Sequence, residues 1–160
     1  MIENAERPGW QEFADRVEIT ELLGRYAHAI DSVDWSLLRT VFTDDVVADF
    51  SSVGQYVEGD GTVTGFDALV AWYEVALAPF FGVLHFMTNH LIELDEDTAR
   101  TRSYMHVLNM SMGGIYHSEC VRTPDGWRIR YFRLEERRWD DVVARLKGHM
   151  TDVDTQTDAP

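Results

Sequence analysis

Residues 85–110 read HFMTNHLIELDEDTARTRSYMHVLNM, and this stretch decides the fold class. HFMTNHLIEL (85–94) is typical of a strand, DED (95–97) of a tight turn, and ARTRSYMHVLNM (99–110) of the returning strand. After a glycine pair, the segments IYHSECVR (115–122) and WRIRYFRLE (127–135) predict two more strands, and the turn signal TPDG (123–126) joins them. The second half of the chain therefore predicts consecutive antiparallel hairpins.

The first half of the chain predicts helices. Apolar side chains recur at helical spacings and form one face: Ile19, Leu22, Leu23, Tyr26 and Ile30. Asp34 is placed to cap a second, short helix whose inner side carries Trp35, Leu38 and Phe42. VVADF (46–50) predicts a short strand, residues 51–64 a turn-containing hairpin, and FDALVAWYEVAL (66–77) a third helix that Pro79 ends.

Helices followed by consecutive hairpins are typical of an α+β fold. The natural packing is a curved antiparallel sheet wrapped around the N-terminal helices, which leaves an internal pocket between them. Residues 1–148 fit a single domain of common size. Its last element is an amphipathic helix around Trp139, which could serve as a lid over the pocket or pack at a subunit interface. Residues 149–160 are expected to be a disordered tail.

Composition excludes several classes of partner. The chain has 14 basic and 28 acidic residues and a net charge of −14, which argues against nucleic acid and anionic membranes as partners. The longest apolar runs, such as APFFGVL, are too short to span a bilayer, and the acidic start shows no secretory signal. The single Cys120 excludes an internal disulfide and a cysteine-rich metal site. We therefore expect a cytoplasmic protein.

Two residues of the first helix are candidates for chemistry. Asp31 continues the edge of the apolar stripe at the helix C-terminus, where burial and the helix dipole both disfavour an ionised carboxylate without compensating donors. The alternative is a solvated turn residue. Tyr26 lies on the stripe itself, where a tyrosine is more often a core residue with a satisfied hydroxyl. The functional alternative is a hydroxyl aimed into the cavity as an acid or hydrogen-bond donor.

The histidines of the hairpin are the next candidates. Strand alternation predicts that His85 and His90 lie on opposite faces, so that they cannot share a metal ion and at most one faces the cavity. His106 on the returning strand lies across from the neighbourhood of His85. Asp31, His85 and His106 could form a three-ligand zinc set, but no HxH or HExxH pattern supports it, and a metal-free site is favoured.

Further residues could contact a ligand. The apolar lining is expected to include Phe50, Trp72, Met87 and Leu108, which implies a hydrophobic small molecule. Arg133 lies in the opposite strand phase to Arg128 and Arg130, so it could enter the pocket. Surface pairing with nearby glutamates is the alternative for Arg133.

Four segments together resemble the SnoaL-like families of the nuclear-transport-factor-2-like superfamily: ITELLGRYAHAIDSVDW (19–35), FTDD (42–45), HFMTN (85–89) and DGWRI (125–129). The resemblance covers about residues 12–140 and implies a cone-shaped α+β barrel. The pattern is most similar to the branch that contains scytalone dehydratase, bile acid 7α-dehydratase and hexachlorocyclohexane dehydrochlorinase. The fold hosts many reactions, so it does not by itself specify one.

The resemblance also implies roles. Asp31 would orient His85, which would act as a general base, and Tyr26 and His106 would assist by polarising a carbonyl or protonating a leaving hydroxyl. A neutral imidazole can accept a proton at cell pH, and well-placed base catalysis contributes roughly 10²–10⁴-fold to a rate. The expected activity is a cofactor-free, dehydratase-type elimination on a cyclic polyketide-, steroid- or terpenoid-like molecule. A homotrimer or homodimer is expected.

Rival functions share much of this pattern. Isomerisation and aldol-type cyclisation also begin with proton removal beside a carbonyl, so the same site could serve them. A non-catalytic assembly subunit, like the small subunit of ring-hydroxylating dioxygenases, would have Asp31 and His85 too far apart to hydrogen-bond. The chemistries of ketosteroid isomerase and limonene epoxide hydrolase are disfavoured, because their acidic strand residues have no counterpart here.

Overall fold

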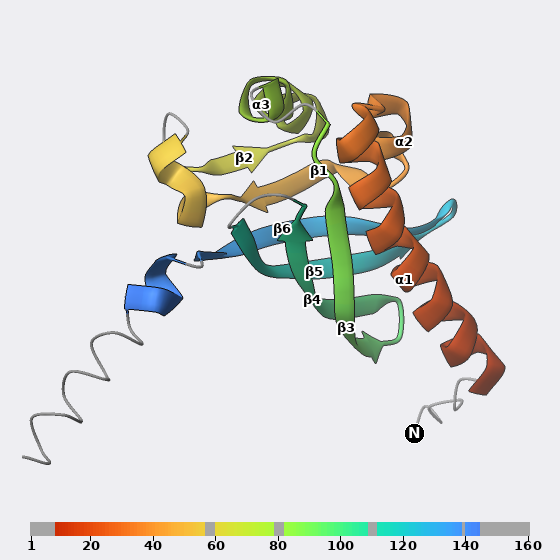
Figure 1. Cartoon of the computed structure of the whole chain (residues 1–160). Helices are drawn as coiled ribbons and strands as arrows, with labels where there is room; N and C mark the ends of the chain where they lie inside the picture. The colour runs from red at the N-terminus through yellow and green to blue at the C-terminus, as the bar shows by residue number, and fades with distance from the viewer. Residues whose placement is uncertain (1–8, 57–59, 79–81, 109–111, 139, 145–160) are drawn as a thin grey trace, which may run out of the picture.

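The structure is a computed structural model that describes residues 9–56, 60–78, 82–108, 112–138 and 140–144. Its elements follow the predicted order of helices before hairpins, which confirms the α+β fold class (Figure 1). The helices are α1 (Gly9–Ser32), α2 (Trp35–Arg39) and α3 (Phe66–Leu77), with a 3-10 segment, η1, at Ser51–Tyr56. The strands are β1 (Phe42–Asp49), β2 (Thr62–Thr64), β3 (His85–Asp95), β4 (Thr98–Val107), β5 (Met112–Thr123) and β6 (Gly126–Arg138).

The six strands form one curved sheet in the order β2-β1-β6-β5-β4-β3. Neighbouring strands are antiparallel except β1 and β6, which run parallel. The sheet is unclosed, with β2 and β3 at its edges, so the expected barrel is open along one side. α1 lies against the β3 side of the sheet, while α3 lies over β1 and β2 at the other end (Figure 1).

A β-bulge in β3 overturns one expectation from strand alternation. The pairing of β3 with β4 shifts between Thr88 and Leu91, and Asn89 adopts a left-handed backbone with φ of 53°. The extra residue reverses the phase of the strand, so His85 before it and His90 after it both face the helices. The prediction that the two histidines lie on opposite faces is therefore wrong.

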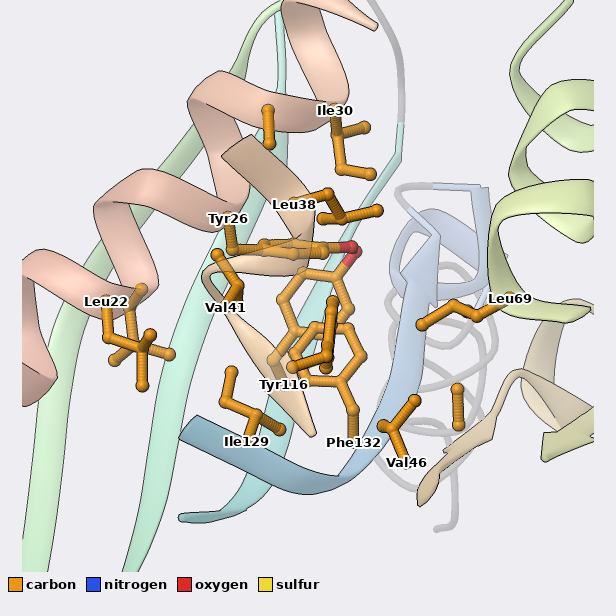
Figure 2. Close-up of a cluster of buried hydrophobic side chains, with 14 of the residues drawn as sticks. Leu22, Tyr26, Ile30, Leu38, Val41, Val46, Leu69, Tyr116, Ile129 and Phe132 are labelled. Atoms are coloured by element: carbon orange, nitrogen blue, oxygen red, sulfur yellow. The ribbon is translucent and has the colours of Figure 1, made fainter. Parts of the chain in front are cut away.

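The core lies between α1 and the inner face of the sheet. The predicted apolar stripe of α1 is fully buried, as are inward side chains of β1, β5 and β6 that meet it. In the view of Figure 2, Tyr26 of α1 lies above Tyr116 and Phe132, with Leu38 above its ring and Val41 below it. Asp34 caps α2 as predicted, because its carboxylate accepts a hydrogen bond from the backbone N–H of Leu37 at 2.9 Å.

A buried ion pair anchors the first half of α1 to the sheet. Asp15 is 1% exposed, and its carboxylate lies 2.7 Å from the guanidinium of Arg122 on β5. Trp127 and Gln11 donate further hydrogen bonds to Asp15 at 3.3 and 3.2 Å, and Arg122 also covers the Trp127 ring. Burial alone would raise the pKa of Asp15, but the hydrogen bonds from Arg122, Trp127 and Gln11 outweigh it and lower that pKa.

The end of the chain is only partly described. Residues 140–144 are helical, which agrees with the start of the helix predicted around Trp139. Trp139 itself, residues 145–148 and the predicted tail lie outside the described residues, so the choice between a lid and an interface stays open. Among the helices that the structure describes, none has the length and apolar character needed to cross a membrane.

Candidate active site

Asp31 lies in the last turn of α1, where the helix offers its carboxylate no free N–H groups. The helix ends at Ser32, and the backbone N–H of Asp34 closes the turn by bonding to the carbonyl of Ala29 at 2.9 Å. Ionised Asp31 therefore needs donors from another element, since the partial charge at this helix end is also negative.

His85, the first residue of β3, supplies those donors. Its ring Nδ1 lies 2.6 Å from Oδ1 of Asp31, and its backbone N–H donates to both carboxylate oxygens at 3.0 and 3.2 Å. The two side chains are only 8% and 13% exposed, for His85 and Asp31 respectively. The carboxylate-to-ring contact that the sequence suggested is thus direct, which is the geometry that an assembly subunit was expected to lack.

The contact with Asp31 selects one tautomer of the His85 ring. A carboxylate only accepts hydrogen bonds, so Nδ1 carries the proton that lies between the two side chains. In a neutral ring, the other nitrogen, Nε2, then carries no proton and has a free lone pair. No hydrogen bond to Nε2 is found within the described part of the chain. Asp31 and His85 together can accept a proton at Nε2 and stabilise the resulting imidazolium.

A pocket of about 320 Å³ opens beside this pair. It lies between the C-terminal end of α1, one face of α3 and the segment that leads into β3. Besides Asp31 and His85, its lining is apolar or aromatic with one further carboxylate: Ile30, Val33, Trp35, Tyr73, Glu74, Leu77, Ala78, Gly82 and Val83. A concave, mostly apolar pocket with a few convergent polar groups is the usual form of a small-molecule site.

One wall residue of the pocket has a strained backbone. Val33 follows the end of α1 with φ of 55°, a left-handed conformation that is rare for a β-branched residue. Such strain persists only where surrounding contacts impose it, and it concentrates at functional sites. Val33 thus turns the chain away from α1 while leaving Asp31 at the pocket wall.

Tyr26 does not line this pocket. It is 1% exposed and lies in the core, where its hydroxyl contacts the hydroxyl groups of Tyr73 and Tyr116 at 3.0 and 3.1 Å. Tyr73 is the member of this trio that belongs to the pocket wall. The interpretation of Tyr26 as a core residue with a satisfied hydroxyl fits this placement better than a direct contact with a ligand.

His106 lies on the opposite face of the sheet from the pocket. β4 alternates strictly between exposed and buried side chains, with His106 exposed and its neighbours Met105 and Val107 buried. Because His85 pairs with Val107 rather than with His106, the two histidines point to different faces. The expectation of His106 as an assisting residue in this pocket is wrong for this reason. The same geometry separates His106 from Asp31 and His85 in the zinc set that was already disfavoured.

The five expected ligand contacts also lie elsewhere. Phe50 is a core residue that stacks on Trp72, with 4.1 Å between ring centroids, and Met87 packs against the same core from β3. Leu108 is 40% exposed. Arg133 pairs in register with Asp49 on the outer face, because an extra residue in β6, between the pairs Cys120–Ile129 and Glu119–Tyr131, places Phe132 inward instead. None of the five lines the pocket described above.

His90 and metal binding can be placed from the same geometry. The ring of His90 lies on the inner face, 2.8 Å from the hydroxyl of the buried Ser103, and burial lowers its pKa. His90 is therefore a packed, hydrogen-bonded histidine. Across the described residues, no group of three or more His, Cys, Asp or Glu side chains is placed to hold a metal ion.

Sequence reasoning missed most of the pocket wall. Tyr73, Glu74 and Leu77 share the α3 face that meets the end of α1, and their three- and four-residue spacing could have marked that face. The position of α3 above the end of α1 had no sequence signal. The pocket therefore sits at the end of the helices and not over the centre of the sheet, where Met87 and Phe50 were expected to form it.

Comparison with known proteins places this fold among related chains. The SnoaL-like domain family matches residues 11–133. An uncharacterised protein of Mycobacterium tuberculosis (strain H37Rv) is 32% identical over 127 residues, which cover 74% of this chain and 82% of that protein. A Kribbella flavida protein of known structure is 28% identical, with a TM-score of 0.69, and the match covers 78% of this chain and 92% of the other.

Two solved structures with named activities are more distant in sequence. A scytalone dehydratase-like protein from Novosphingobium aromaticivorans is 18% identical, with a TM-score of 0.67 over 79% of this chain and 86% of its own. A hexachlorocyclohexane dehydrochlorinase from Novosphingobium barchaimii is also 18% identical, with a TM-score of 0.63, and the match covers 78% of this chain and 88% of the other. At this identity the likeness concerns the fold alone.

Proposed function

This chain belongs to the SnoaL-like domain family, and from that premise we propose that it is a cofactor-free lyase that eliminates water from a small, uncharged cyclic molecule. The observation that carries the proposal is the 2.6 Å contact between Asp31 and His85 at the wall of an apolar pocket. A base held in one tautomer beside a ligand-sized cavity has the geometry that proton removal requires.

The proposed reaction needs one base and a substrate with a hydroxyl group β to a carbonyl. Nε2 of His85 takes the proton from the carbon between the two groups, and the electrons of that C–H bond form the new C=C bond. The C–O bond to the hydroxyl breaks, and the imidazolium returns its proton to the departing oxygen as water. Asp31 stabilises the imidazolium between these two transfers.

The size of the pocket limits the substrate. At roughly 30 Å³ per water-sized group, a cavity of about 320 Å³ holds on the order of ten non-hydrogen atoms. One or two rings therefore fill it, and a steroid-sized ligand would extend through the mouth. This favours the smaller members of the polyketide- and terpenoid-like class.

The charge of the lining also limits the substrate. Among the described residues, Asp31 and Glu74 are the charged lining residues besides the titratable His85, and none of the described lining residues is a lysine or arginine. A carboxylate or phosphate would enter without a cation to pair with, at a high desolvation cost. We therefore expect an uncharged molecule with at least one oxygen function.

Isomerisation and aldol-type cyclisation remain alternatives with the same first step. A non-catalytic subunit is the alternative from a different class, and the direct contact of Asp31 with His85 favours an enzyme over it. Deuterium exchange separates the classes without knowledge of the natural substrate, because a base that removes the proton beside a carbonyl can replace it with deuterium from the solvent, whereas a non-catalytic subunit has no base to do so.

The test is incubation of the protein in D₂O with one- and two-ring ketones and β-hydroxy ketones, followed by NMR of the α-carbon protons and absorbance of any enone formed. We expect enzyme-dependent exchange with wild-type protein, enone formation from the β-hydroxy ketones, and loss of both in His85→Gln. His90→Gln is the matched control, since His90 is on the same strand and outside the pocket. Exchange that is equal in both variants would contradict the role of His85.

Self-association stays a prediction. The outer face of β3 and β4 carries three large apolar side chains, each at least 47% exposed: Phe86, Leu91 and Tyr104. Leu108, directly after β4, is 40% exposed. Exposed apolar patches of this kind often mark protein interfaces, which supports the expected homodimer or homotrimer. Light scattering after size exclusion would report the mass, and Tyr104→Glu should lower it if this face is the interface.

A further inference from the structure

Three buried tyrosines connect the core to the pocket. Tyr26 on α1, Tyr73 on α3 and Tyr116 on β5 are all less than 4% exposed, and their hydroxyl groups meet at 3.0 Å (Tyr26 to Tyr73) and 3.1 Å (Tyr26 to Tyr116). Figure 2 shows the hydroxyl ends of Tyr26 and Tyr116 beside each other. Within this row of three hydrogen-bonded tyrosines, Tyr73 is the end residue that lies on the pocket wall.

The surroundings of Tyr73 hold its ring in place. Trp35, another pocket residue, stacks on the ring, with 6.4 Å between centroids and 16° between planes, while Phe50 and Trp72 pack against its other sides. Burial also raises the pKa of all three phenols well above the ordinary value, so each hydroxyl keeps its proton in neutral solution. The three tyrosines therefore act by hydrogen bonding.

The direction of the hydrogen bonds among the three tyrosines follows from the number of hydroxyl protons. A phenol has one proton to donate. Tyr26 donates its proton to Tyr116, so the contact between Tyr26 and Tyr73 must be made by the proton of Tyr73. The oxygen of Tyr73 then has no proton left for the pocket and keeps free acceptor capacity.

We propose that Tyr73 binds the substrate by accepting a hydrogen bond from a ligand hydroxyl group, and that Tyr26 and Tyr116 position it and set its polarity. The inference rests on the proposed function, because it takes the pocket beside His85 as the substrate site. It adds that the bound molecule is recognised by an alcohol group, which a dehydratase substrate carries and its enone product lacks. Product would then be held less tightly than substrate.

The test uses three probes of one shape and different hydrogen-bonding capacity. 1-Tetralol both donates and accepts, 1-tetralone only accepts, and tetralin does neither, and all three match the size of the cavity. Calorimetry on wild-type protein should show 1-tetralol bound about three- to tenfold more tightly than the other two, as expected for one net hydrogen bond. Tyr73→Phe should narrow the preference for 1-tetralol, because Nε2 of His85 is then the remaining acceptor, and its melting temperature reports whether the fold is kept.

Tyr116→Phe separates this role from a structural one. Without the Tyr116 oxygen, the proton of Tyr26 is free to turn to Tyr73, and the proton of Tyr73 is free to turn to the pocket. We expect this variant to gain affinity for 1-tetralone, by about threefold or more, while a packing defect would weaken all three probes alike. This variant also tests the proposal if Tyr73→Phe does not fold.

Several results would overturn the inference. These are equal affinity of wild type for 1-tetralol and tetralin, an unchanged alcohol preference in Tyr73→Phe, an unchanged ketone affinity in Tyr116→Phe, or no binding of any probe. His85→Gln distinguishes a failure here from a failure of the proposed function. If His85 is the base but Tyr73 does not bind alcohols, deuterium exchange depends on His85 while the probes show no preference. If instead the probes show the alcohol preference but deuterium exchange does not depend on His85, Tyr73 is a binding residue in a pocket without catalysis.

Discussion

The buried Asp15 and the partly buried Asp31 of α1 have opposite surroundings. Asp15 near the start of the helix is 1% exposed and is enclosed by contacts with Arg122, Trp127 and Gln11. Asp31 near the end is 13% exposed, faces a pocket of about 320 Å³, and bonds to a histidine. Arginine keeps its charge at any relevant pH, whereas an imidazole can gain and lose a proton.

This difference shows what separates a structural carboxylate from a candidate catalytic one. Both side chains are paired across the molecule with a residue of the sheet, so burial and pairing alone do not distinguish them. The space beside the pair and the ability of the partner to exchange a proton do. The following substitutions test whether the two ends of α1 divide stability and activity in this way.

The largest effect is expected on the rate in Asp31→Asn. The amide oxygen can still accept the backbone N–H of His85, but the amide NH₂ donates to Nδ1 and moves the ring proton to Nε2, where it blocks proton acceptance. Deuterium exchange or elimination should slow by roughly 10²–10⁴-fold, with a small change in melting temperature. Asp15→Asn should leave the rate of the folded protein near that of wild type. Full activity in Asp31→Asn would remove the proposed role of the pair.

The second effect is expected on stability in Asp15→Asn. Breaking this pair leaves Arg122 without its buried partner, which should lower the free energy of unfolding by about 3 kcal/mol, at the lower end for buried pairs because Arg122 keeps Asp97. Urea unfolding at neutral pH measures it. Glu12→Gln is the control, because its ion pair with Arg16 is exposed and should contribute less than about 1 kcal/mol. Equal losses at Asp15 and Glu12 would show that the buried pair adds no special stability.

The stabilising effect of Asp15 should also depend on pH. Its pKa in the folded protein lies below the value in the unfolded chain, so its contribution is complete above about pH 4 and declines as the pH falls through the folded value. The difference in unfolding free energy between wild type and Asp15→Asn should be constant from pH 7 to 5 and should shrink at pH 3. A difference that grows on acidification would contradict the assigned direction of the pKa shift.

The smallest effect concerns the backbone beside Asp31. Val33 has φ of 55° and is 43% exposed, so Val33→Asn relieves left-handed strain with little loss of burial and should stabilise the fold by up to about 1 kcal/mol. Val75→Asn is a matched control, since Val75 is exposed within α3 and has no such strain. Thermal unfolding distinguishes them, and a loss of stability at both positions would show that Val33 is not strained.

The Asp31–His85 pair of the candidate site was predictable because both residues carry a family pattern, whereas most of the pocket wall was not. Asp31 and His85 were identified from their segments' resemblance to SnoaL-like chains, and their direct contact fits that expectation. Periodicity alone placed Asp31 only at the edge of a stripe and left the face of His85 undecided. Tyr73 was not identified, because a tyrosine in an apolar helix has no sequence feature that distinguishes a pocket wall from a core position.

The sequence by itself determined the order of the helices and strands, because burial imposes a local period that is readable along each segment. Some extents differ: Phe42, expected on the second helix, opens β1, and residues 51–56, expected in a hairpin, form η1. Only the tertiary structure decided which residues share a site. The contact between Asp31 and His85 spans 54 residues, the bulge at Asn89 moved His90 to their face of the sheet, and the alternation of β4 took His106 away from it. Register, bulges and helix placement depend on contacts between distant segments, and local periodicity contains no record of them.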